Sequence, residues 1–461
     1  MAKFNVNEIV KATGGRLIMG SGAVAREVGI DSRTIKRGSL FIAITGEKFD
    51  GHKFIGPAFD KGASMAMVSD ERATGKFPGK TFVVVDDTTE ALQALAAYHR
   101  SRFARLKIVC VTGSNGKTTV KDMIASVLSQ KYKTLKTIGN LNNHIGAPLT
   151  LLRLTQKDEA AVVEIGMNAP GEIALLSKMV KPSVGVITNI SLAHIGNFKS
   201  LKAVRDAKGE LLLNMPPRAV AVLNADDPQS RALIENAKPR VMTFGKNPVA
   251  DVSLTDSWPD SGRGSLAAIH YKNRETQVHI PVAGSHNTGN ALAAFCAGII
   301  LGVSREKIAK GIEKTKPAPM RMELVTLPNG AALINDSYNA NPASTRAAIE
   351  SAASQRGDGK LIFVFGDMLE LGSRAEAEHK RVGAIAAKAG VDAMYTFGKR
   401  AKLAARTAAA RGVKIKRGKT HQQIAQSLVK FLRPGDTALV KGSRGVQMEK
   451  VIERLTAMME G

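Results

Sequence analysis

Short apolar runs and stretches of helical periodicity alternate along the middle of the chain. The runs KIVCVTG at 107–113, AAVVEIG at 160–166 and SVGVITNI at 183–190 are each followed by a segment with helix-like spacing of apolar residues. Apolar strands that alternate with helices are typical of a mainly parallel sheet covered on both faces. We therefore predict a central α/β domain in this region.

The chain on either side of this region carries similar patterns. Before it, three short apolar runs between residues 39 and 87 precede a helical stretch from Glu90 to Arg102. After it, the segment KTKPAPMR at 314–321 holds two prolines beside basic residues, as an interdomain hinge would. Four further apolar runs follow, each joined to a helix-like stretch. The pattern predicts three α/β domains, the last of them Rossmann-like, at residues 1–105, 106–316 and 317–461.

One stretch of the central region departs from the alternation. Residues 251–282 are polar and rich in turn-forming residues, which predicts an antiparallel edge on the otherwise parallel sheet. Helical periodicity returns at 287–302.

Length and composition fit a folded protein with several domains. A chain of 461 residues is too long for one compact core, and hydrophobic residues make up 44% of it. Both cysteines, Cys110 and Cys296, lie in apolar runs, so we expect neither a disulfide framework nor a thiolate metal cluster. The sequence has no export signal and no apolar run of ~18 residues, which predicts a cytoplasmic protein without a membrane span.

The formal net charge of +26 raises the question of a polyanionic partner. A basic surface gains affinity for nucleic acid by releasing counterions from phosphates. The basic residues are scattered along the sequence, however, aromatic residues make up only 5%, and no helix-turn-helix, zinc-finger or base-stacking motif occurs. We therefore expect no specific nucleic-acid partner and consider a small polyanionic substrate sufficient.

The segment VTGSNGKTT at 111–119 lies between an apolar strand and a helical stretch. Glycines there let backbone N–H groups converge on phosphate oxygens, the following helix points its positive end at them, and a lysine adds a charge. The loop is shorter than the usual P-loop, because Val111 takes the place of the first glycine. The segment predicts a triphosphate-binding loop, with a threonine hydroxyl (Thr118) able to join Mg²⁺, formed by Thr112, Gly113, Ser114, Asn115, Gly116, Lys117, Thr118 and Thr119.

This short spacing resembles the ATP loop of the Mur ligases and of the related folylpolyglutamate synthetases. Further matches follow in the order of the Mur ligase family and cover nearly the whole chain, among them GNLNNHIGAPLTLL at 139–152, VVEIGMNAPGEI at 162–173, AKGE at 207–210, GSHNTGNALAA at 284–294, NDSYNANPAS at 335–344 and KGSRGVQME at 441–449. The resemblance implies a UDP-binding N-terminal domain, a central ATPase domain and a C-terminal ligase domain. It also implies an ATP-dependent, ADP-forming amide ligase.

In this family ATP phosphorylates a carboxylate, and an amine then displaces phosphate from the acyl phosphate. Phosphoryl transfer depends on positioning and on neutralising the phosphate charge, so ATP, Mg²⁺ and a catalytic role for Lys117 are expected. Glu164 ends an apolar strand and is expected to bind Mg²⁺. A salt-bridged carboxylate at the strand end is the alternative for Glu164.

His194 and Lys208 are the other candidates for catalysis and metal binding. The resemblance implies that His194 lies near a second metal and the acyl phosphate, although a lone histidine is otherwise more often a core residue. Lys208 resembles the position at which several Mur ligases carry a lysine carbamate, which is a bidentate oxygen ligand. The alternative for Lys208 is an ordinary cation beside phosphate, because burial must first suppress the ammonium form.

Several residues outside the loop are candidates for ATP binding. The resemblance assigns Asn287 and Asn290, three apart on one helix face, to adenine, with a helix N-cap as the alternative for Asn287. It assigns Arg321 to phosphate and Asp336 to ribose, once the C-terminal domain has closed over the site. Of two adjacent asparagines, Asn143 is the one expected to face the γ-phosphate.

Two motif groups indicate the substrates. Residues 31–63 resemble the uridine-binding domain shared by the members that add the third amino acid and the dipeptide, which implies UDP contacts from Ser32, Arg33, Thr45 and Gly46. NDSYNANPAS and FGDMLELG resemble the dipeptide-adding member. The resemblance therefore implies ligation of D-alanyl-D-alanine to UDP-N-acetylmuramoyl-tripeptide for peptidoglycan synthesis, with contacts near the dipeptide from Ser337, Tyr338, Asn339 and Asn341.

Two other functions stay open as hypotheses. The sister ligase that adds the third amino acid shares the N-terminal domain, although its D-N-P-R motif does not occur here. A P-loop switch or motor would account for Gly113 to Thr118 but would leave the uridine-domain match unexplained. We expect the protein to act as a monomer.

Overall fold

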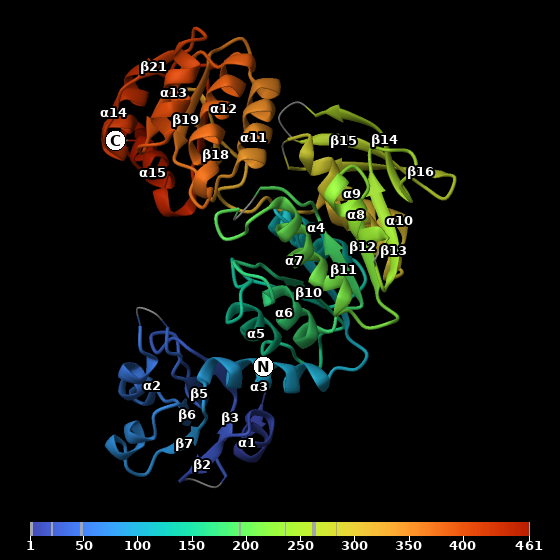
Figure 1. The fold of residues 1–461 in the computed structure, drawn as a ribbon, viewed down its shortest axis with the longest axis vertical. Helices are drawn as coiled ribbons and strands as arrows, with labels where there is room; N and C mark the ends of the chain where they lie inside the picture. The colour runs from blue at the N-terminus through green and yellow to red at the C-terminus, as the bar shows by residue number, and fades with distance from the viewer. Residues whose placement is uncertain are drawn as a thin grey trace.

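The computed structural model describes residues 3–19, 22–46, 49–192, 195–235, 237–260, 264–282 and 284–460. They form three α/β domains that follow one another in space as they do along the chain (Figure 1). This confirms the predicted fold class. No helix in the described ranges is both long and apolar enough to cross a bilayer.

The N-terminal domain is built on a five-stranded sheet. Its strand order is β2-β7-β6-β5-β4, and only β2 is antiparallel to its neighbour. The strands are Arg16–Ile18 (β2), Glu27–Gly29 (β4), Ser39–Ile42 (β5), Met65–Val68 (β6) and Thr81–Val84 (β7). A small pair of antiparallel strands adjoins it, β1 (Phe4–Asn5) and β3 (Val24–Ala25). Its helices are α1 (Val6–Thr13), α2 (Ile55–Asp60) and α3 (Thr88–Ser101).

Helix α3 links this domain to the central one. It begins after Asp87, whose carboxylate accepts hydrogen bonds from the backbone N–H groups of Thr89 and Glu90. Near its end, the buried Arg100 donates from Nε to Val180 O at 3.0 Å, and His99 Nε2 lies 3.0 Å from Leu154 O. Both acceptors belong to the central domain, so buried polar contacts fasten the two domains together.

The central domain has a nine-stranded sheet in the order β16-β15-β14-β13-β12-β11-β8-β10-β9. The seven strands from β14 to β9 are parallel, and β15 and β16 complete the predicted antiparallel edge. Their bounds are Lys107–Thr112 (β8), Thr134–Lys136 (β9), Ala160–Glu164 (β10), Val184–Ile187 (β11), Val220–Asn224 (β12), Arg240–Gly245 (β13), Val252–Pro259 (β14), Ser265–Tyr271 (β15) and Arg274–Ile280 (β16).

Helices cover both faces of this sheet (Figure 1). Strands β8, β10 and β11 are almost entirely buried, which explains their continuous apolar sequences. The helices are Lys117–Leu128 (α4), Gly146–Leu151 (α5), Glu172–Val180 (α6), Leu201–Leu213 (α7), Pro228–Ile234 (α8), His286–Ile300 (α9) and Arg305–Glu313 (α10).

The C-terminal domain has a six-stranded sheet in the order β17-β18-β22-β19-β20-β21. Only β17 is antiparallel, and the last strand of the chain, β22, lies between β18 and β19. The strands are Glu323–Thr326 (β17), Ala332–Asp336 (β18), Leu361–Gly366 (β19), Ala393–Phe397 (β20), Lys414–Lys416 (β21) and Thr437–Lys441 (β22).

Alternate residues of β19 face two separate cores in this domain. Phe363 and Phe365 pack with α11, α12 and α13, whereas Ile362 and Val364 pack with α14 and α15. The helices span Pro342–Gln355 (α11), Ala375–Lys388 (α12), Ala401–Ala409 (α13), His421–Phe431 (α14) and Glu449–Glu460 (α15). The domain is therefore a three-layer sandwich in which α13 and α14 lie on opposite faces, and β21 is the edge between them.

Candidate active site

A cavity of about 980 Å³ opens between the central and C-terminal domains. It lies at the carboxyl ends of β8, β10 and β11, the edge at which parallel α/β sheets bind ligands. The central domain contributes the phosphate loop, Glu164 and Lys208 to its walls, and the C-terminal domain contributes Arg321 and Asp336. The cavity therefore brings together predicted site residues from two domains.

Two glycines give the phosphate loop its shape. Gly113 and Gly116 have φ angles of 149° and 78°, which side chains disfavour. A Cβ atom on Gly113 would lie 1.9 Å from Thr188 Oγ1, and one on Gly116 would lie 2.5 Å from Asn290 Oδ1. Both positions therefore need glycine for conformation and for space. Thr112 and Gly113 lie behind the lining of the cavity, while residues 114–119 form part of it.

Neighbouring strand ends fasten the loop from the other side. Thr188 Oγ1 donates to Asn115 O at 2.5 Å, and the Asn189 side chain accepts from Asn115 N at 3.0 Å. Ser191 N donates to Ser114 Oγ at 2.9 Å. These three residues lie in the TNIS segment directly after β11. They were not predicted as site residues, although polar residues that directly follow an apolar strand could have indicated them. These bonds fix the backbone of the loop at Ser114 and Asn115.

Lys117 lies at the first turn of α4, directly after the loop. Its ammonium group donates to Gly113 O at 2.8 Å. Burial lowers the pKa of Lys117, the nearby Glu164 carboxylate raises it, and Arg321 lowers it further. The side chain thus lies within the loop, beside the helix N-terminus where an anion would bind.

Glu164 is a buried carboxylate at the carboxyl end of β10, near Lys117. Its Oε1 accepts a hydrogen bond from Asn142 Nδ2 at 2.8 Å, whereas its Oε2 is buried and lacks a hydrogen-bond partner among the described residues. The hydroxyl of Thr112, on the adjacent strand β8, is buried and unpartnered as well. A hard cation would satisfy such an oxygen, so this set fits Mg²⁺.

A second lysine, Lys121, also lies close to Glu164, and the sequence analysis did not predict it as a site residue. Lys121, on α4, is buried; its ammonium lies 4.0 Å from Glu164 Oε2 and 3.5 Å from Asp122 Oδ1, and it donates to Thr137 O at 3.1 Å. A lysine one turn after Lys117 gives a weak signal, because such a residue more often faces solvent.

We expect Lys121→Met to lower the free energy of unfolding by roughly 3–5 kcal/mol, because it removes one of the two lysine charges that compensate the buried Glu164 carboxylate. Lys136→Met is the matched control: its ammonium lies 2.7 Å from the same Asp122, yet half of its side chain is exposed. That pair should contribute less than about 1 kcal/mol. Urea unfolding without nucleotide measures both, and adding Glu164→Gln to Lys121→Met should recover part of the loss. Equal effects of the two lysine substitutions would contradict the assignment.

Lys208 lies on α7 with its side chain buried at the cavity wall. Burial lowers the pKa of Lys208 well below the usual value for lysine, and the neighbouring Lys117 lowers it further. The neutral amine is the form that captures CO₂, so the surroundings of Lys208 meet the condition for a carbamate. Predicted metal ligand His194 lies outside the described residues. Within those residues, no three His, Cys, Asp or Glu side chains gather as a metal-binding group.

The asparagines predicted for ATP lie at the cavity in different settings. Asn143 accepts hydrogen bonds from Ile145 N and Gly146 N, so its side chain also shapes the start of α5. Asn290 Nδ2 donates to Asn287 Oδ1 at 2.7 Å, and both side chains are buried. Asn287 is the second residue of α9, whose N-cap position is Ser285, so the N-cap alternative for Asn287 is wrong.

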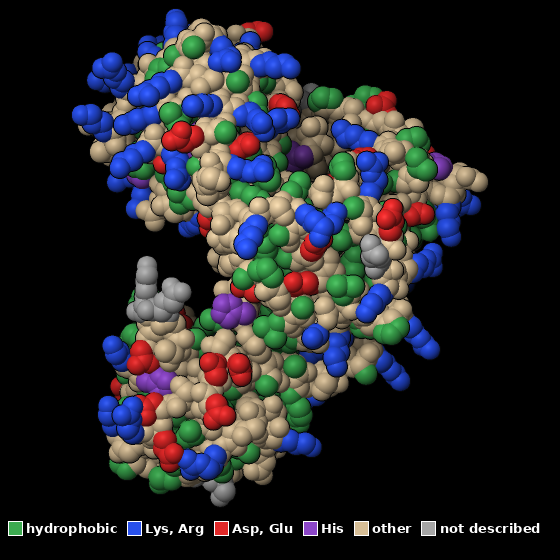
Figure 2. Space-filling view, in the orientation of Figure 1, with side chains coloured by type: hydrophobic (Ala, Val, Ile, Leu, Met, Phe, Trp, Pro, Cys, Tyr) green, Lys and Arg blue, Asp and Glu red, His purple; other side chains and the backbone are tan. Residues whose placement is uncertain are grey.

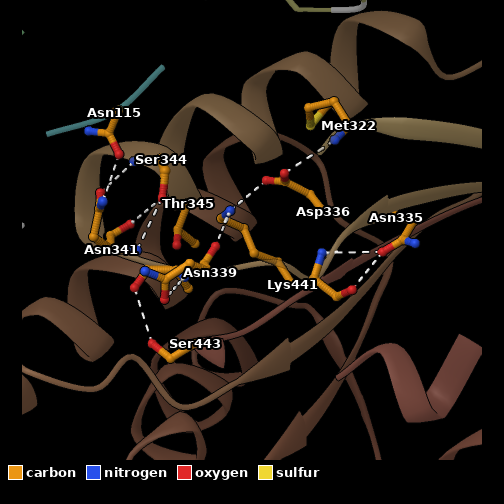
Figure 3. Close-up of polar contacts among 12 residues, drawn as sticks. Asn115, Met322, Asn335, Asp336, Asn339, Asn341, Ser344, Thr345, Lys441 and Ser443 are labelled. Atoms are coloured by element: carbon orange, nitrogen blue, oxygen red, sulfur yellow. Dashed lines mark hydrogen bonds and ion pairs between the residues drawn. The ribbon is translucent and has the colours of Figure 1, made fainter. Parts of the chain in front are cut away.

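Two contacts join the C-terminal domain to the phosphate loop. Arg321 Nη2 donates to Thr118 Oγ1 at 3.0 Å, and its guanidinium lies 4.1 Å from the centre of the Tyr338 ring. Asn341, the N-cap of α11, donates from Nδ2 to Asn115 Oδ1 at 2.6 Å (Figure 3). The C-terminal domain therefore already touches the residues that are predicted to hold ATP.

Asp336 belongs to a buried ion pair at the end of β18. Lys441 Nζ lies 2.5 Å from Asp336 Oδ2 and also donates to Asn339 O at 2.9 Å (Figure 3). Lys441 was not predicted as a site residue, although its position at the end of an apolar strand, in the segment KGSRGV, could have indicated one. Ser337 is fully buried, donates to Asn335 Oδ1 at 2.6 Å and does not line the cavity, whereas Tyr338 does.

The residues predicted to bind UDP lie apart from this cavity. Ser32, Arg33, Thr45 and Gly46 belong to the N-terminal domain, and no described residue of that domain lines the cavity. Arg33 is exposed and, by hydrogen bonding to Asp31, lowers the pKa of that carboxyl to about 2. A wide notch separates the N-terminal domain from the C-terminal one (Figure 2). A ligand that reaches both sites must therefore be extended.

Comparison with known proteins agrees across all three domains. Profiles of the Mur ligase family catalytic domain, the Mur ligase middle domain and the Mur ligase glutamate ligase domain match residues 25–100, 111–298 and 320–444. The UDP-N-acetylmuramoyl-tripeptide--D-alanyl-D-alanine ligase of Bacillus subtilis is 37% identical over 98% of this chain and 97% of its own. The ligase of the same name from Escherichia coli is 35% identical over 99% of both.

Solved structures extend this agreement to the arrangement of the domains. MurF from Acinetobacter baumannii superposes with a TM-score of 0.91 at 33% identity, over 99% of each chain. The MurF ligase of Thermotoga maritima, solved in complex with ADP, gives a TM-score of 0.82 at 28% identity, over 95% of this chain and 98% of that one. A UDP-N-acetylmuramoyl-L-alanyl-D-glutamate--2,6-diaminopimelate ligase is 18% identical with a TM-score of 0.54 and shares the fold alone. With its phosphate loop, its interdomain cavity and these full-length relatives in agreement, the chain belongs to the Mur ligase family.

Proposed function

We propose that this chain joins D-alanyl-D-alanine to UDP-N-acetylmuramoyl-tripeptide, with cleavage of ATP to ADP and phosphate, in the synthesis of peptidoglycan. The main support is structural: the phosphate loop faces the C-terminal domain across one cavity. The chain also matches ligases of this name over nearly its full length. The lower likeness to the ligase that adds the third residue favours the dipeptide. We also assign the reaction to the cytoplasm, and the active form to a monomer.

The chemistry takes two steps in this proposal. A carboxylate oxygen of the tripeptide attacks the γ-phosphorus of ATP, forming an acyl phosphate and releasing ADP. The dipeptide amine then attacks the acyl carbon, loses a proton, and phosphate leaves as the amide bond forms. The loop N–H groups and Lys117 bind the phosphates, and Arg321 adds a second fixed charge from the C-terminal domain, which stabilises the transferring group.

Magnesium fits the oxygens at the end of β10. Thr118, Glu164, His194 and a carbamylated Lys208 are the proposed ligands, and the bound ion would neutralise phosphate charge. Glu164 supports this with its unpartnered buried oxygen, and Lys208 with its suppressed ammonium form. The carbamate would supply acidic oxygens at a site where the described residues offer few.

The remaining residues divide among the three substrates. We assign Asn143 to the γ-phosphate, Asn287 and Asn290 to adenine, and Asp336, oriented by Lys441, to ribose. The segment after β18 is assigned to the dipeptide, through Tyr338, Asn339 and Asn341, with Ser337 supporting its turn. The N-terminal domain holds UDP near Ser32, Arg33, Thr45 and Gly46. This assigns UDP to residues 1–105, most of the ATP contacts to 106–316, and the dipeptide together with the ATP contacts of Arg321 and Asp336 to 317–461, with catalysis at the boundary of the last two.

Purified protein should release ADP and phosphate at a substantial rate only when UDP-N-acetylmuramoyl-tripeptide and D-alanyl-D-alanine are both present. The reason is that the acyl phosphate needs the first substrate and its consumption needs the second. The measurement is ADP release over a matrix of nucleotide peptides and acceptors, with product masses read directly. Turnover with ATP alone, or a preference for one diamino acid on the UDP-dipeptide, would contradict the proposal.

A further inference from the structure

One segment of the C-terminal domain carries positive charge without any acidic residue, whereas basic residues elsewhere are scattered among acidic ones. Residues 393–435 contain eleven lysines and arginines and neither aspartate nor glutamate. The eleven residues are Lys399, Arg400, Lys402, Arg406, Arg411, Lys414, Lys416, Arg417, Lys419, Lys430 and Arg433. Lys416 is half-buried, and the other ten are exposed.

The fold places this segment on one side of the domain. It supplies α13, the edge strand β21 and α14, so the basic residues continue from one face of the sandwich, around its edge, to the other face. Figure 2 shows lysine and arginine side chains gathered on this part of the domain, where Figure 1 labels β21, α13 and α14. We call this surface the basic edge.

None of the eleven cations has an ion pair with an acidic side chain in the described part of the chain. Lys416 instead lies over the Phe431 ring, 4.3 Å from its centre, and Lys360 lies over the same ring at 5.4 Å. Charged side chains on an edge strand keep it from pairing with another chain, and β21 itself carries two lysines for this purpose. Eleven unpaired cations exceed that need, and their mutual repulsion makes an anionic partner favourable.

We propose that the basic edge docks the protein on an anionic lipid bilayer. Long lysine and arginine side chains can reach headgroups while their stems lie along the surface. Ile415 is exposed between Lys414 and Lys416 on β21, a pattern that suits the boundary between headgroups and acyl chains. Single-stranded nucleic acid would be bound by exposed aromatic rings. The aromatic residues of the segment are buried or half-buried.

Docking at this surface leaves the cavity open. None of the eleven basic residues lines the cavity. The cavity-lining residues nearest to them in the sheet order, 369–371, follow β19, which is two strand spacings from β21, or ~10 Å at the usual spacing. The basic edge therefore lies outside the proposed catalytic machinery, and its role is independent of which substrates the cavity takes.

The test compares two quadruple variants of the full chain. Lys402, Lys414, Lys419 and Lys430 are replaced by Gln in the first, and Lys157, Lys178, Lys238 and Lys307, exposed lysines of the central domain without ion pairs among the described residues, are replaced in the second. Binding is measured by cosedimentation with vesicles of phosphatidylglycerol mixed with phosphatidylcholine, and with phosphatidylcholine alone. A fluorescent DNA duplex in the same buffer is the competing polyanion.

The wild-type chain should sediment with the anionic vesicles alone and be released by high salt, since surface charges are screened. The first variant should lose at least about tenfold in affinity, while the second keeps it. Absence of wild-type binding to anionic vesicles, or an equal loss in both variants, would overturn the proposal. Tighter binding to the duplex than to the vesicles would overturn it in favour of nucleic acid. Both variants should keep ADP release, so a failure of docking stays distinct from a failure of the proposed reaction.

Discussion

Replacing Lys117 with Ala should lower the rate of ADP release by about 10²–10³-fold while leaving the folded state about as stable as before. The ammonium lies inside the phosphate loop, where it can neutralise charge that develops during phosphoryl transfer. Stability should hold because removing this buried lysine relieves a desolvation cost, and because Lys121 still lies beside Glu164. The measurements are kcat and KM for ATP, with urea unfolding alongside.

The control for Lys117 is Lys131→Ala, three residues beyond the end of α4. Lys131 is exposed and donates to Gly302 O at 2.5 Å, far from the loop. Its loss should leave turnover within about twofold, since surface substitutions away from special features have small effects. Near-normal turnover by Lys117→Ala, or a fall that merely follows lost stability, would remove Lys117 from the phosphate site.

Replacing Lys208 with Ala should nearly abolish activity, and small carboxylic acids such as acetate should restore part of it. An amine is a poor ligand for Mg²⁺, whereas a carbamate offers the hard oxygen atoms that this ion prefers. A carboxylate in solution can occupy the space left by the side chain and supply those atoms. Activity is measured over a series of acids and, in parallel, a series of alkylamines.

A second readout does not depend on activity. Wild-type protein equilibrated with carbon-13 bicarbonate should show a carbamate carbonyl resonance that Lys208→Ala lacks and Lys202→Ala keeps. Lys202 lies on the same helix, is exposed and pairs with Asp206 at 2.9 Å. Rescue by amines rather than acids, together with no such resonance, would leave Lys208 as an ordinary cation.

The sequence predicted the parts of this molecule that depend on neighbouring residues. The glycines of VTGSNGKTT determine the turn between β8 and α4, and the polar run at 251–282 determines the antiparallel edge. Each is a local pattern with a direct physical cause, either a positive φ angle or a strand with one solvated face. The three α/β domains followed from such patterns in succession.

What the sequence did not predict depends on strand order and on packing. Lys441 meets Asp336 because β22, the last strand, inserts beside β18, with the two residues in register. Lys121 becomes a buried partner of Glu164 only when α4 lies on β10. Ser337 turns inward to Asn335, which a motif resemblance cannot reveal. The run of basic residues at 393–435 is visible in the sequence, but its placement around one edge of the sheet follows only from the order of the strands.

The attachment of α3 to the central domain has a consequence for substrate choice. Arg100 and His99 are buried where they bond to Val180 and Leu154, and these contacts hold the N-terminal domain against the central domain that carries the phosphate loop. Under the proposed function, the nucleotide peptide is anchored at one end and must present its carboxylate at the other. One residue of extended chain spans roughly 3.3–3.6 Å. The two domains then act as a ruler, which accepts a peptide of the right length and leaves the carboxylate of a shorter one out of reach of ATP.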